Sequence, residues 1–332
     1  MKIIKILIIN IFLFYNLSAF SDEADFNDWL VQFKKKAIGN NISELTFNKV
    51  MKNAKYLSKV IEYDRYQPEF YEDTLTYISK RTSKKKVKNG IKIYNDNKEL
   101  INNIDNNFFV EKELLLSLMG IETNFGTYLG KMDIISSLAT LSFDKRRSAF
   151  FTSELITLLK LVEENIIDHD ILYGSWAGAY GNFQFMPSTI ENYAVDFNSD
   201  NKIELKSYDD SFASAANYLN KLGWKKKGLC YKKITLTENV PKKYLNTSAR
   251  KLNHKKKIKS FKKYIKNFNT LDIDGNEVVA IITPDKDIIP DAQTLKPAYI
   301  VFSNYELILK WNRSLRFALA VCNLKEKIKN EL

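Results

Sequence analysis

The stretch EKELLLSLMGIETNFG, residues 111–126, places a single carboxylate behind a run of leucines. Four side chains fall at i, i+3, i+4 and i+7 and so share one helix face: Leu115, Leu118, Met119 and Glu122. The pattern predicts that Glu122 occupies a buried position at the end of a core helix. A desolvated carboxyl resists ionisation, so it can keep a proton near neutral pH and donate it. The alternative is a Glu that reaches solvent where the helix ends at Asn124 and Gly126.

The first residues carry a candidate export signal. Lys2 and Lys5 precede an apolar run over residues 6–17, and small residues follow before the first acids. This order is typical of a secretory signal peptide and predicts cleavage after about Ser21. The apolar run is short for a membrane span, and no cysteine follows it that could carry a lipid anchor. We therefore expect a periplasmic mature protein, with an uncleaved anchor as the alternative.

The scarcity of histidine and cysteine limits the chemistry. A histidine-ligated zinc site or a Ser-His-Asp triad could use only His169 or His254, and neither lies in a recognisable motif. Two cysteines, Cys230 and Cys322, are too few for a disulfide framework. The sequence leaves open whether they form one bridge or remain two buried thiols. We expect that the protein uses no organic cofactor. We also expect that it is a monomer.

Positive charge concentrates in residues 225–266, which hold 16 Lys and Arg against one acid, Glu238. Such a segment suits a polyanion, and export makes nucleic acid the least fitting one. We expect no nucleic-acid partner. The segment is interpreted as a peripheral contact for an acidic wall or membrane surface, with a solvated lysine-rich insertion as the alternative.

Periodicity predicts a mainly helical α+β chain. Residues 26–100 have helical spacing with a break expected at Gly90, and residues 304–328 return to it. Short alternating runs after Trp224 predict the strands of a small sheet. Six of the eleven glycines lie between positions 120 and 181. Since glycines let backbone approach backbone or ligand, we expect the cleft in this region.

The loop over residues 173–193, YGSWAGAYGNFQFMPSTIENY, combines glycines, aromatic rings, hydroxyls and an amide. Aromatic faces stack on the C–H surfaces of sugars, and neutral polar groups bind their hydroxyls, so this lining suits carbohydrate. A glycine-rich structural turn is the alternative. The candidate sugar ligands of this loop are Ser175, Tyr180, Phe183 and Gln184.

The chain resembles the lytic murein transglycosylase B family, which cleaves the glycan of bacterial peptidoglycan. The resemblance is carried by GIETNFGTYLGKMDIISSLATLSFDKRRSAFF from residue 120, GSWAGAYGNFQFMPSTIENYAVDFNSD from residue 174, YDRYQPEFYEDTLTYISKR, SAANYLNKLGW and WNRSLRFALAV. The fold it implies has a lysozyme-like catalytic core, a helical N-terminal domain and a small β insertion. With the periodicity, this predicts a signal peptide over 1–21, a helical domain over 22–105, the core over 106–222, a basic β-domain over 223–298, and a C-terminal helix over 299–332 that packs back on the helical region.

The resemblance also implies site residues. Glu122 matches the single catalytic acid/base of the family, and Ser175, Gln184 and Tyr218 match residues that line its sugar groove. Trp311 and Asn312 of the C-terminal motif are further candidate substrate contacts. The chain departs from the family at Trp311 and Phe317, where tyrosines are typical. Both rings are kept and both hydroxyls are lost, so we expect no substrate contacts through these hydroxyls but expect catalysis to be retained.

The mechanism implied needs only one carboxylate. A hydrolase normally places a second carboxylate across the scissile bond. Family members instead let the 6-hydroxyl of muramic acid attack the anomeric carbon, so one Glu acts first as acid and then as base. Cleavage of the MurNAc-β-1,4-GlcNAc bond then gives a 1,6-anhydro sugar. The nearest acids after Glu122 are Asp133 and Asp144, to which the matched motifs give no catalytic role. A hydrolytic muramidase and a non-catalytic peptidoglycan-binding scaffold are the alternatives.

The segment DFNSDNKIELKSYDD, residues 196–210, has oxygen ligands at the spacing of an EF-hand-like loop. The chain departs from that loop at two positions, with Asn201 where it prefers Gly and Ser207 where it prefers Glu. Asn tolerates a left-handed backbone. The acid that closes the site is identified through the family resemblance. The predicted calcium ligands are Asp196, Asn198, Asp200, the Lys202 carbonyl and Asp210. An Asx-rich turn held by its own hydrogen bonds is the alternative.

Overall fold

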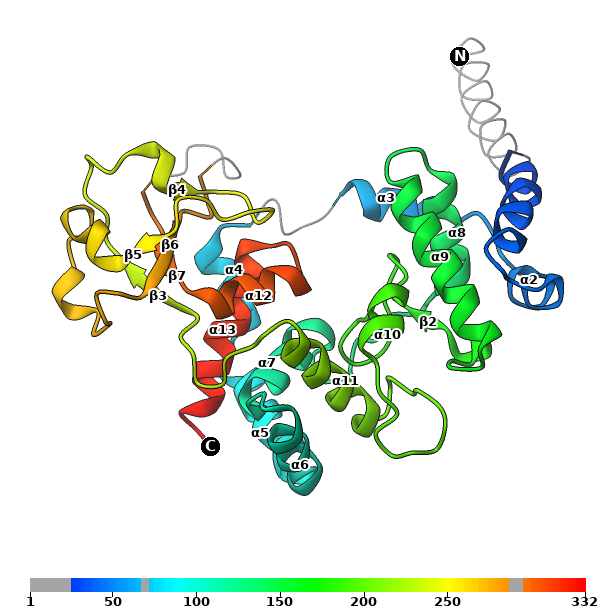
Figure 1. The fold of residues 1–332 in the computed structure, drawn as a ribbon, viewed down its shortest axis with the longest axis horizontal. Coiled ribbons are helices and arrows are strands. Elements are labelled where there is room, and N and C mark those ends of the chain that lie inside the picture. Colours follow the sequence, from blue (N-terminus) through cyan, green and yellow to red (C-terminus); the bar gives the residue numbers. More distant parts are fainter. Residues whose placement is uncertain (1–24, 67–71, 287–294) are drawn as a thin grey trace, which may run out of the picture. The chain divides into compact units, whose positions relative to one another are not determined.

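The computed structural model describes residues 25–66, 72–286 and 295–332 (Figure 1). The predicted signal peptide lies outside these residues. The described chain divides into two compact units. The first comprises residues 25–66, 129–192 and 199–204, and the second comprises 72–128, 193–198, 205–286 and 295–332. No helix among the described residues is both long and apolar enough to cross a membrane.

The first unit is almost entirely helical. A helix over 25–38 is followed by α2 (Glu44–Met51), α3 (Ser58–Arg65), α8 (Ile134–Phe143), α9 (Ser148–Glu163) and α10 (Pro187–Tyr193). Helices α8 and α9, both green in Figure 1, pack side by side and form its centre. The strands β1 (Met132–Asp133) and β2 (Tyr173–Gly174) pair antiparallel, with Met132 opposite Gly174. Asp133 caps α8 because its Oδ1 accepts from Ser136 N at 3.1 Å.

The second unit contains α7 (Lys112–Thr123) and further helices that pack on α7 or on α13. They are α4 (Thr74–Arg81), α5 (Lys84–Asp96), α6 (Lys98–Phe108), α11 (Tyr208–Lys221), α12 (Ser303–Trp311) and α13 (Leu315–Lys329). Helix α13 packs most extensively on α7, and α5, α6 and α11 also contact it. The helix break expected at Gly90 is wrong, because α5 continues through it. Gly90 is buried, and a Cβ there would meet Ile328 Cδ1 at 3.0 Å, so close helix packing explains the glycine.

The second unit also holds a five-stranded sheet. Strands β3 (Tyr231–Ile234), β7 (Ala298–Val301), β6 (Val278–Ile282) and β4 (Leu245–Asn246) follow in that order, and β5 (Lys256–Lys257) pairs with β6. The register places Ile281 opposite Ile300, and both side chains are buried in the core of the sheet. Three short 3-10 helices, Lys242–Tyr244, Ile258–Tyr264 and Phe268–Thr270, complete this region.

The predicted α+β class with a predominance of helix is confirmed, as are strands after Trp224. The sheet ends at Val301 in β7, slightly beyond the boundary predicted at 298. The domain boundaries stay a prediction. The question left open for the two cysteines is answered by a disulfide between Cys230, just before β3, and Cys322 in α13.

Candidate functional site

Glu122 lies in the last turn of α7 in the second unit. Leu115, Leu118 and Met119 are fully buried, as the helical stripe predicts, whereas Glu122 is half-buried. The expectation of a core position is therefore wrong for the carboxylate. The helix ends directly after it, because Asn124 has φ of +50° and leaves the helical backbone. Glu122 thus has an apolar helix behind it and a partly accessible head group.

The indole of Trp311 contacts this carboxylate. Trp311 is the last residue of α12, and its Nε1 donates a hydrogen bond to Glu122 Oε1 at 3.0 Å. The indole N–H thus supplies a hydrogen-bond donor at the position where the family resemblance predicts a tyrosine hydroxyl. Phe317 is buried at 4% exposure, so a hydroxyl there would need a partner inside the core. The spacing of motifs could not predict this contact, because the two residues are 189 positions apart.

Two tyrosines extend this arrangement into a row of three rings. Tyr218 stacks on Trp311 with ring centroids 5.1 Å apart, and Tyr193 stacks on Tyr218 at 4.2 Å. The Tyr218 hydroxyl donates to the Lys310 carbonyl at 3.4 Å, and burial raises the pKa of that hydroxyl. Asn312 follows α12, where its backbone N–H donates to the Ile308 carbonyl. The rings of the second unit thus include Tyr193, the last residue of α10, which the sequence did not distinguish from the other aromatic residues of the loop over 173–193.

The glycine-rich loop belongs to the first unit. The hydroxyl of Ser175 accepts from Ala179 N at 2.9 Å and Ala177 N at 3.2 Å, so this side chain shapes the loop itself. Gln184 has φ of +52°, and its Nε2 donates to the Gly181 carbonyl at 3.0 Å. Both side chains are half-buried. Their assignment as sugar ligands stays a prediction.

Tyr180 and Phe183 come from the same loop but are each only 2% exposed. Their rings pack inside and offer little surface on which a sugar could stack. A short bridge between Tyr180 and Phe185 fixes the loop backbone at this point. The spacing and composition of the sequence could not distinguish rings that pack in the interior from rings that face a ligand. Their interpretation as sugar ligands stays a prediction.

The predicted calcium ligands are divided between the units: Asp196, Asn198 and Asp210 in the second, Asp200 and Lys202 in the first. In the second unit, Asp210 is 1% exposed and its Oδ1 accepts from Phe197 N at 2.9 Å. In the first, Asp200 Oδ1 accepts from Lys202 N at 2.9 Å.

The backbone and the donor chemistry of this loop both fit a hard cation. Asn201 has φ of +67°, the left-handed conformation expected at the position where an EF-hand prefers glycine. The predicted ligands are carboxylate, amide and carbonyl oxygens, which calcium prefers, and include neither sulfur nor nitrogen. The residues present therefore fit calcium.

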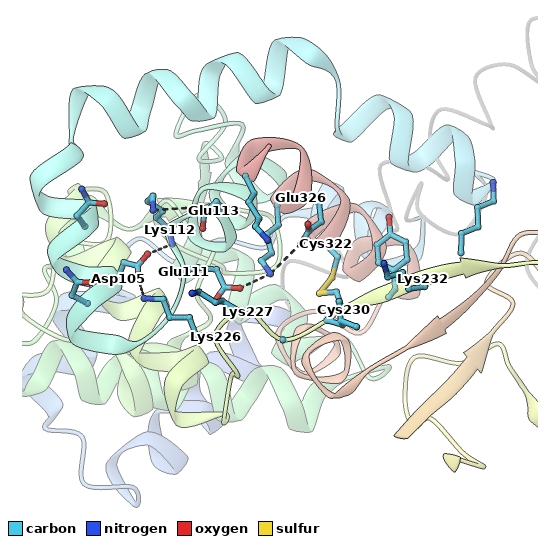
Figure 2. Close-up of a pocket in the computed structure, with 18 residues that line it drawn as sticks. Asp105, Glu111, Lys112, Glu113, Lys226, Lys227, Cys230, Lys232, Cys322 and Glu326 are labelled. Atoms are coloured by element: carbon cyan, nitrogen blue, oxygen red, sulfur yellow. Dashed lines mark hydrogen bonds and ion pairs between the residues drawn. A yellow bond between two sulfur atoms is a disulfide. The ribbon is translucent and has the colours of Figure 1, made fainter. Parts of the chain in front are cut away.

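A polar cavity of about 670 Å³ lies at the other end of α7 (Figure 2). Glu111, Lys112 and Glu113 line it, roughly 15 Å along the helix from Glu122 at 1.5 Å per residue. Its acids face lysines: Lys226 pairs with Asp105, and Lys112 with Glu113 at 3.4 Å. Glu122 and Trp311 are not part of this lining.

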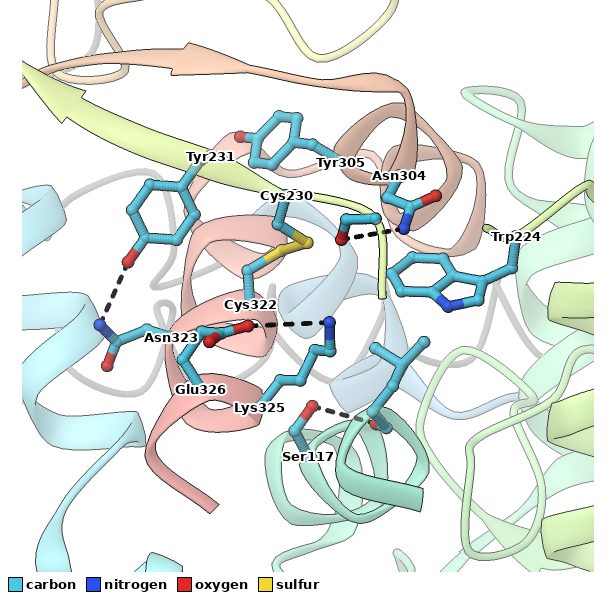
Figure 3. Close-up of a disulfide and its surroundings, with 12 residues drawn as sticks. Ser117, Trp224, Cys230, Tyr231, Asn304, Tyr305, Cys322, Asn323, Lys325 and Glu326 are labelled. Atoms are coloured by element: carbon cyan, nitrogen blue, oxygen red, sulfur yellow. Dashed lines mark hydrogen bonds and ion pairs between the residues drawn. A yellow bond between two sulfur atoms is a disulfide. The ribbon is translucent and has the colours of Figure 1, made fainter. Parts of the chain in front are cut away.

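Lys325 and Trp224 lie near the Cys230–Cys322 disulfide at the same end of α7 (Figure 3). Glu111 Oε2 accepts from Trp224 Nε1 at 2.8 Å, and Glu111 Oε1 pairs with Lys325 Nζ at 2.7 Å. Lys325 lies on α13, three residues beyond Cys322. These contacts therefore tie the start of α7 to α13 and to the chain that leads into β3.

The sequence and the fold both match known proteins. The family model described as Transglycosylase SLT domain matches residues 25–326. Membrane-bound lytic murein transglycosylase B of Escherichia coli (strain K12) is 39% identical over 153 residues, which are 46% of this chain and 42% of that protein. The match thus spans less than half the length of this curated relative.

Two solved structures are similar over most of the chain. SltB3 from Pseudomonas aeruginosa in complex with NAG-NAM-pentapeptide is 28% identical with a TM-score of 0.79, covering 92% of this chain and 79% of that one. The lytic transglycosylase Slt35 of Escherichia coli in complex with calcium is 25% identical with a TM-score of 0.75, covering 91% and 93%.

Proposed function

The chain belongs to the Transglycosylase SLT domain family, and on that premise we propose that it is a peptidoglycan lytic transglycosylase. The substrate is the glycan strand, cleaved between N-acetylmuramic acid and N-acetylglucosamine. The complex of SltB3 with NAG-NAM-pentapeptide supports this substrate class. The observation that carries the proposal is Glu122, half-buried at the end of an apolar helix and held by an N–H donor.

Glu122 acts twice in the proposed reaction. As an acid it protonates the oxygen that leaves from the anomeric carbon, and the resulting carboxylate then takes the proton of the 6-hydroxyl. That hydroxyl oxygen bonds to the anomeric carbon, so the product is a 1,6-anhydro sugar and no water is consumed. Asp133 and Asp144 both make structural contacts in the first unit. Asp133 caps α8, and Asp144 forms an ion pair with Arg65 at 2.9 Å. Their engagement supports a mechanism with one carboxylate.

A calcium ion is proposed for the loop over residues 196–210, with Asp196, Asn198, Asp200, the Lys202 carbonyl and Asp210 as its ligands. The complex of Slt35 with calcium supports this assignment. Calcium would neutralise the carboxylates and fix the loop.

The proposed location is the periplasm. The disulfide between Cys230 and Cys322 supports an oxidising compartment, in which such bonds persist. The lysine-rich segment over 225–266 is proposed to contact acidic wall or membrane surfaces. The predicted monomer and the absence of a nucleic-acid partner stay predictions.

The experiment is mass spectrometry of the soluble products from purified peptidoglycan, incubated with the wild type or with Glu122→Gln. The amide oxygen of this variant can still accept from Trp311, so the substitution removes the proton and keeps the contact. Glu113→Gln on the same helix is the matched control. We expect anhydro-muropeptides from the wild type and the control only. Reducing-end products would mean a hydrolytic muramidase, and binding without products would mean a scaffold.

A further inference from the structure

The hydrogen bond from Trp311 to Glu122 runs in one direction only. An indole N–H is a donor and has no acceptor capacity, unlike a phenol hydroxyl, which can donate and accept. Glu122 Oε1 must therefore act as the acceptor in this contact, at 3.0 Å from Trp311 Nε1.

This direction decides between the two oxygens of the protonated carboxyl. The carbonyl oxygen of a carboxylic acid is a better acceptor than its hydroxyl oxygen, so the oxygen facing the indole takes the carbonyl role. We propose that Trp311 is a positioning residue that fixes the reactive proton of Glu122 on Oε2. The inference rests on the proposed function, in which Glu122 is the acid and then the base.

The indole itself is held in orientation by its neighbours. Trp311 stacks on Tyr218 with 28° between the ring planes, and Tyr218 stacks on Tyr193 at the same angle. The Tyr218 hydroxyl also donates to the carbonyl of Lys310, the residue directly before Trp311. A donor held in this way loses little further freedom when it binds the carboxyl, because the rings already restrict its rotamers.

The same contact becomes stronger once the proton has left. A hydrogen bond to a carboxylate is roughly twice as strong as one to a neutral carbonyl. Trp311 therefore stabilises the ionised form of Glu122, which is the form that acts as base. Without this donor, Glu122 would stay protonated to a higher pH.

Other titratable groups of the second unit also lie on elements packed against α7. Tyr218 of α11 is neutral near pH 7, since burial raises the pKa of its hydroxyl, and Lys86 of α5 donates to the Gly120 carbonyl. Asp105 of α6 and Lys325 of α13 engage the N-terminal end of α7, where they contact Lys112 N and Glu111. Burial lowers the pKa of the Lys86 ammonium to about 8. Lys86 is unchanged in every variant of the test, so its titration is common to all the profiles.

The test compares the pH dependence of kcat and KM for the wild type, Trp311→Phe and Trp311→Tyr. Phe keeps a ring for the stack and removes the donor. We expect Trp311→Phe to lower kcat about tenfold, to change KM little, and to move the alkaline limb of the profile up by about one pH unit. We expect Trp311→Tyr to recover part of both effects, because its hydroxyl can donate.

Trp224→Phe is the matched control. It removes another indole N–H bond to a glutamate on the same unit, from Trp224 to Glu111 at 2.8 Å, at the far end of α7. We expect it to leave the alkaline limb in place. A Trp311→Phe profile that coincides with the wild type, or a raised KM with unchanged kcat, would overturn the inference in favour of a purely sugar-stacking Trp311.

A second measurement is independent of turnover. Titration of the Glu122 side-chain carboxyl by ¹³C NMR, assigned by its loss in Glu122→Gln, should show ionisation at higher pH in Trp311→Phe than in the wild type. An unchanged titration overturns the positioning role even if the enzyme is active. A shifted titration in a protein that yields no anhydro product supports the contact and counts against the proposed function alone.

Discussion

Arg316 Nη2 donates to Asp285 Oδ1 at 2.9 Å inside the second unit, and both side chains are buried. Asp285 follows β6, Arg316 lies in α13, and Thr74 N at the start of α4 also donates to Asp285 at 3.0 Å. One carboxylate thus joins the sheet to two helices.

Removing that carboxylate should destabilise the protein strongly. Asp285→Ala removes the carboxylate that pairs with the buried Arg316 guanidinium, and breaking a buried ion pair costs about 3–5 kcal/mol in comparable cases. The free energy of unfolding from urea titration checks this. Glu306→Gln breaks the exposed pair with Lys255 at 3.0 Å and should change little. Similar midpoints for the two variants would contradict the role assigned to Asp285.

The disulfide should contribute about as much to the free energy of unfolding as the buried Asp285–Arg316 pair. Cys230 and Cys322 are 92 residues apart, and closing a loop of that length restricts the unfolded chain by about 4.6 kcal/mol in the chain-entropy model. The double variant Cys230→Ser/Cys322→Ser should therefore melt at lower temperature, with no further change on adding reductant. Wild-type protein in reductant is the paired measurement. Free thiols in the denatured, unreduced wild type would contradict the bridge.

The sequence predicts the helix behind Glu122 well, since a buried stripe depends on local spacing alone. Leu115, Leu118 and Met119 are buried as their period requires. Glu122 itself differs because helix termination at Asn124 is a local backbone event that the stripe does not encode.

Long-range contacts are the part that could not be predicted. Gly90 looked like a helix break, yet α5 continues through it. Ile328 and Phe125 pack tightly against this position, which favours a residue without a side chain. The bond from Trp311 to Glu122 likewise depends on how α12 and α7 pack, which neither segment specifies alone. The chemical type of each candidate side chain could be predicted from the sequence. Which residues that side chain contacts could be determined only from the fold.

Lys86 should make stability depend on pH in the alkaline range. Burial, with a smaller contribution from the Arg81 charge, lowers the pKa of the Lys86 ammonium to about 8 from 10.5. Between these values the unfolded chain holds more protons than the folded one, so the free energy of unfolding rises with pH. Relative to Lys86→Met, the wild type should gain of order 1 to 2 kcal/mol from pH 8 to 10.5, allowing for its partial exposure.

Chemical denaturation of both proteins at pH 7.5, 9 and 10.5 measures this gain. Lys80→Met in the neighbouring helix α4 controls for general charge effects, because Lys80 is an exposed lysine paired with Glu72. If the free energy of unfolding changes with pH in the same way for the wild type and Lys86→Met, the pKa of the Lys86 ammonium is not lowered by its surroundings.

Calcium binding should raise the melting temperature of metal-stripped protein. A ligand that binds only the folded state at 100 times its dissociation constant stabilises by about 2.7 kcal/mol. Magnesium should substitute poorly, because it demands a tighter octahedral site than a loop of protein oxygens offers. Scanning calorimetry with EGTA, calcium or magnesium measures the effect.

Two asparagine variants localise that effect. Asp200→Asn should abolish the calcium response, because it removes a charged ligand while its side-chain oxygen can still accept from Lys202 N. Asp274→Asn is the matched control, since Asp274 Oδ1 accepts from Asn276 N at 2.9 Å in the same kind of local turn. We expect the control to keep the full response. If calcium leaves the melting temperature of the wild type unchanged, the loop over 196–210 is an Asx-rich turn held by its own hydrogen bonds and not a calcium site.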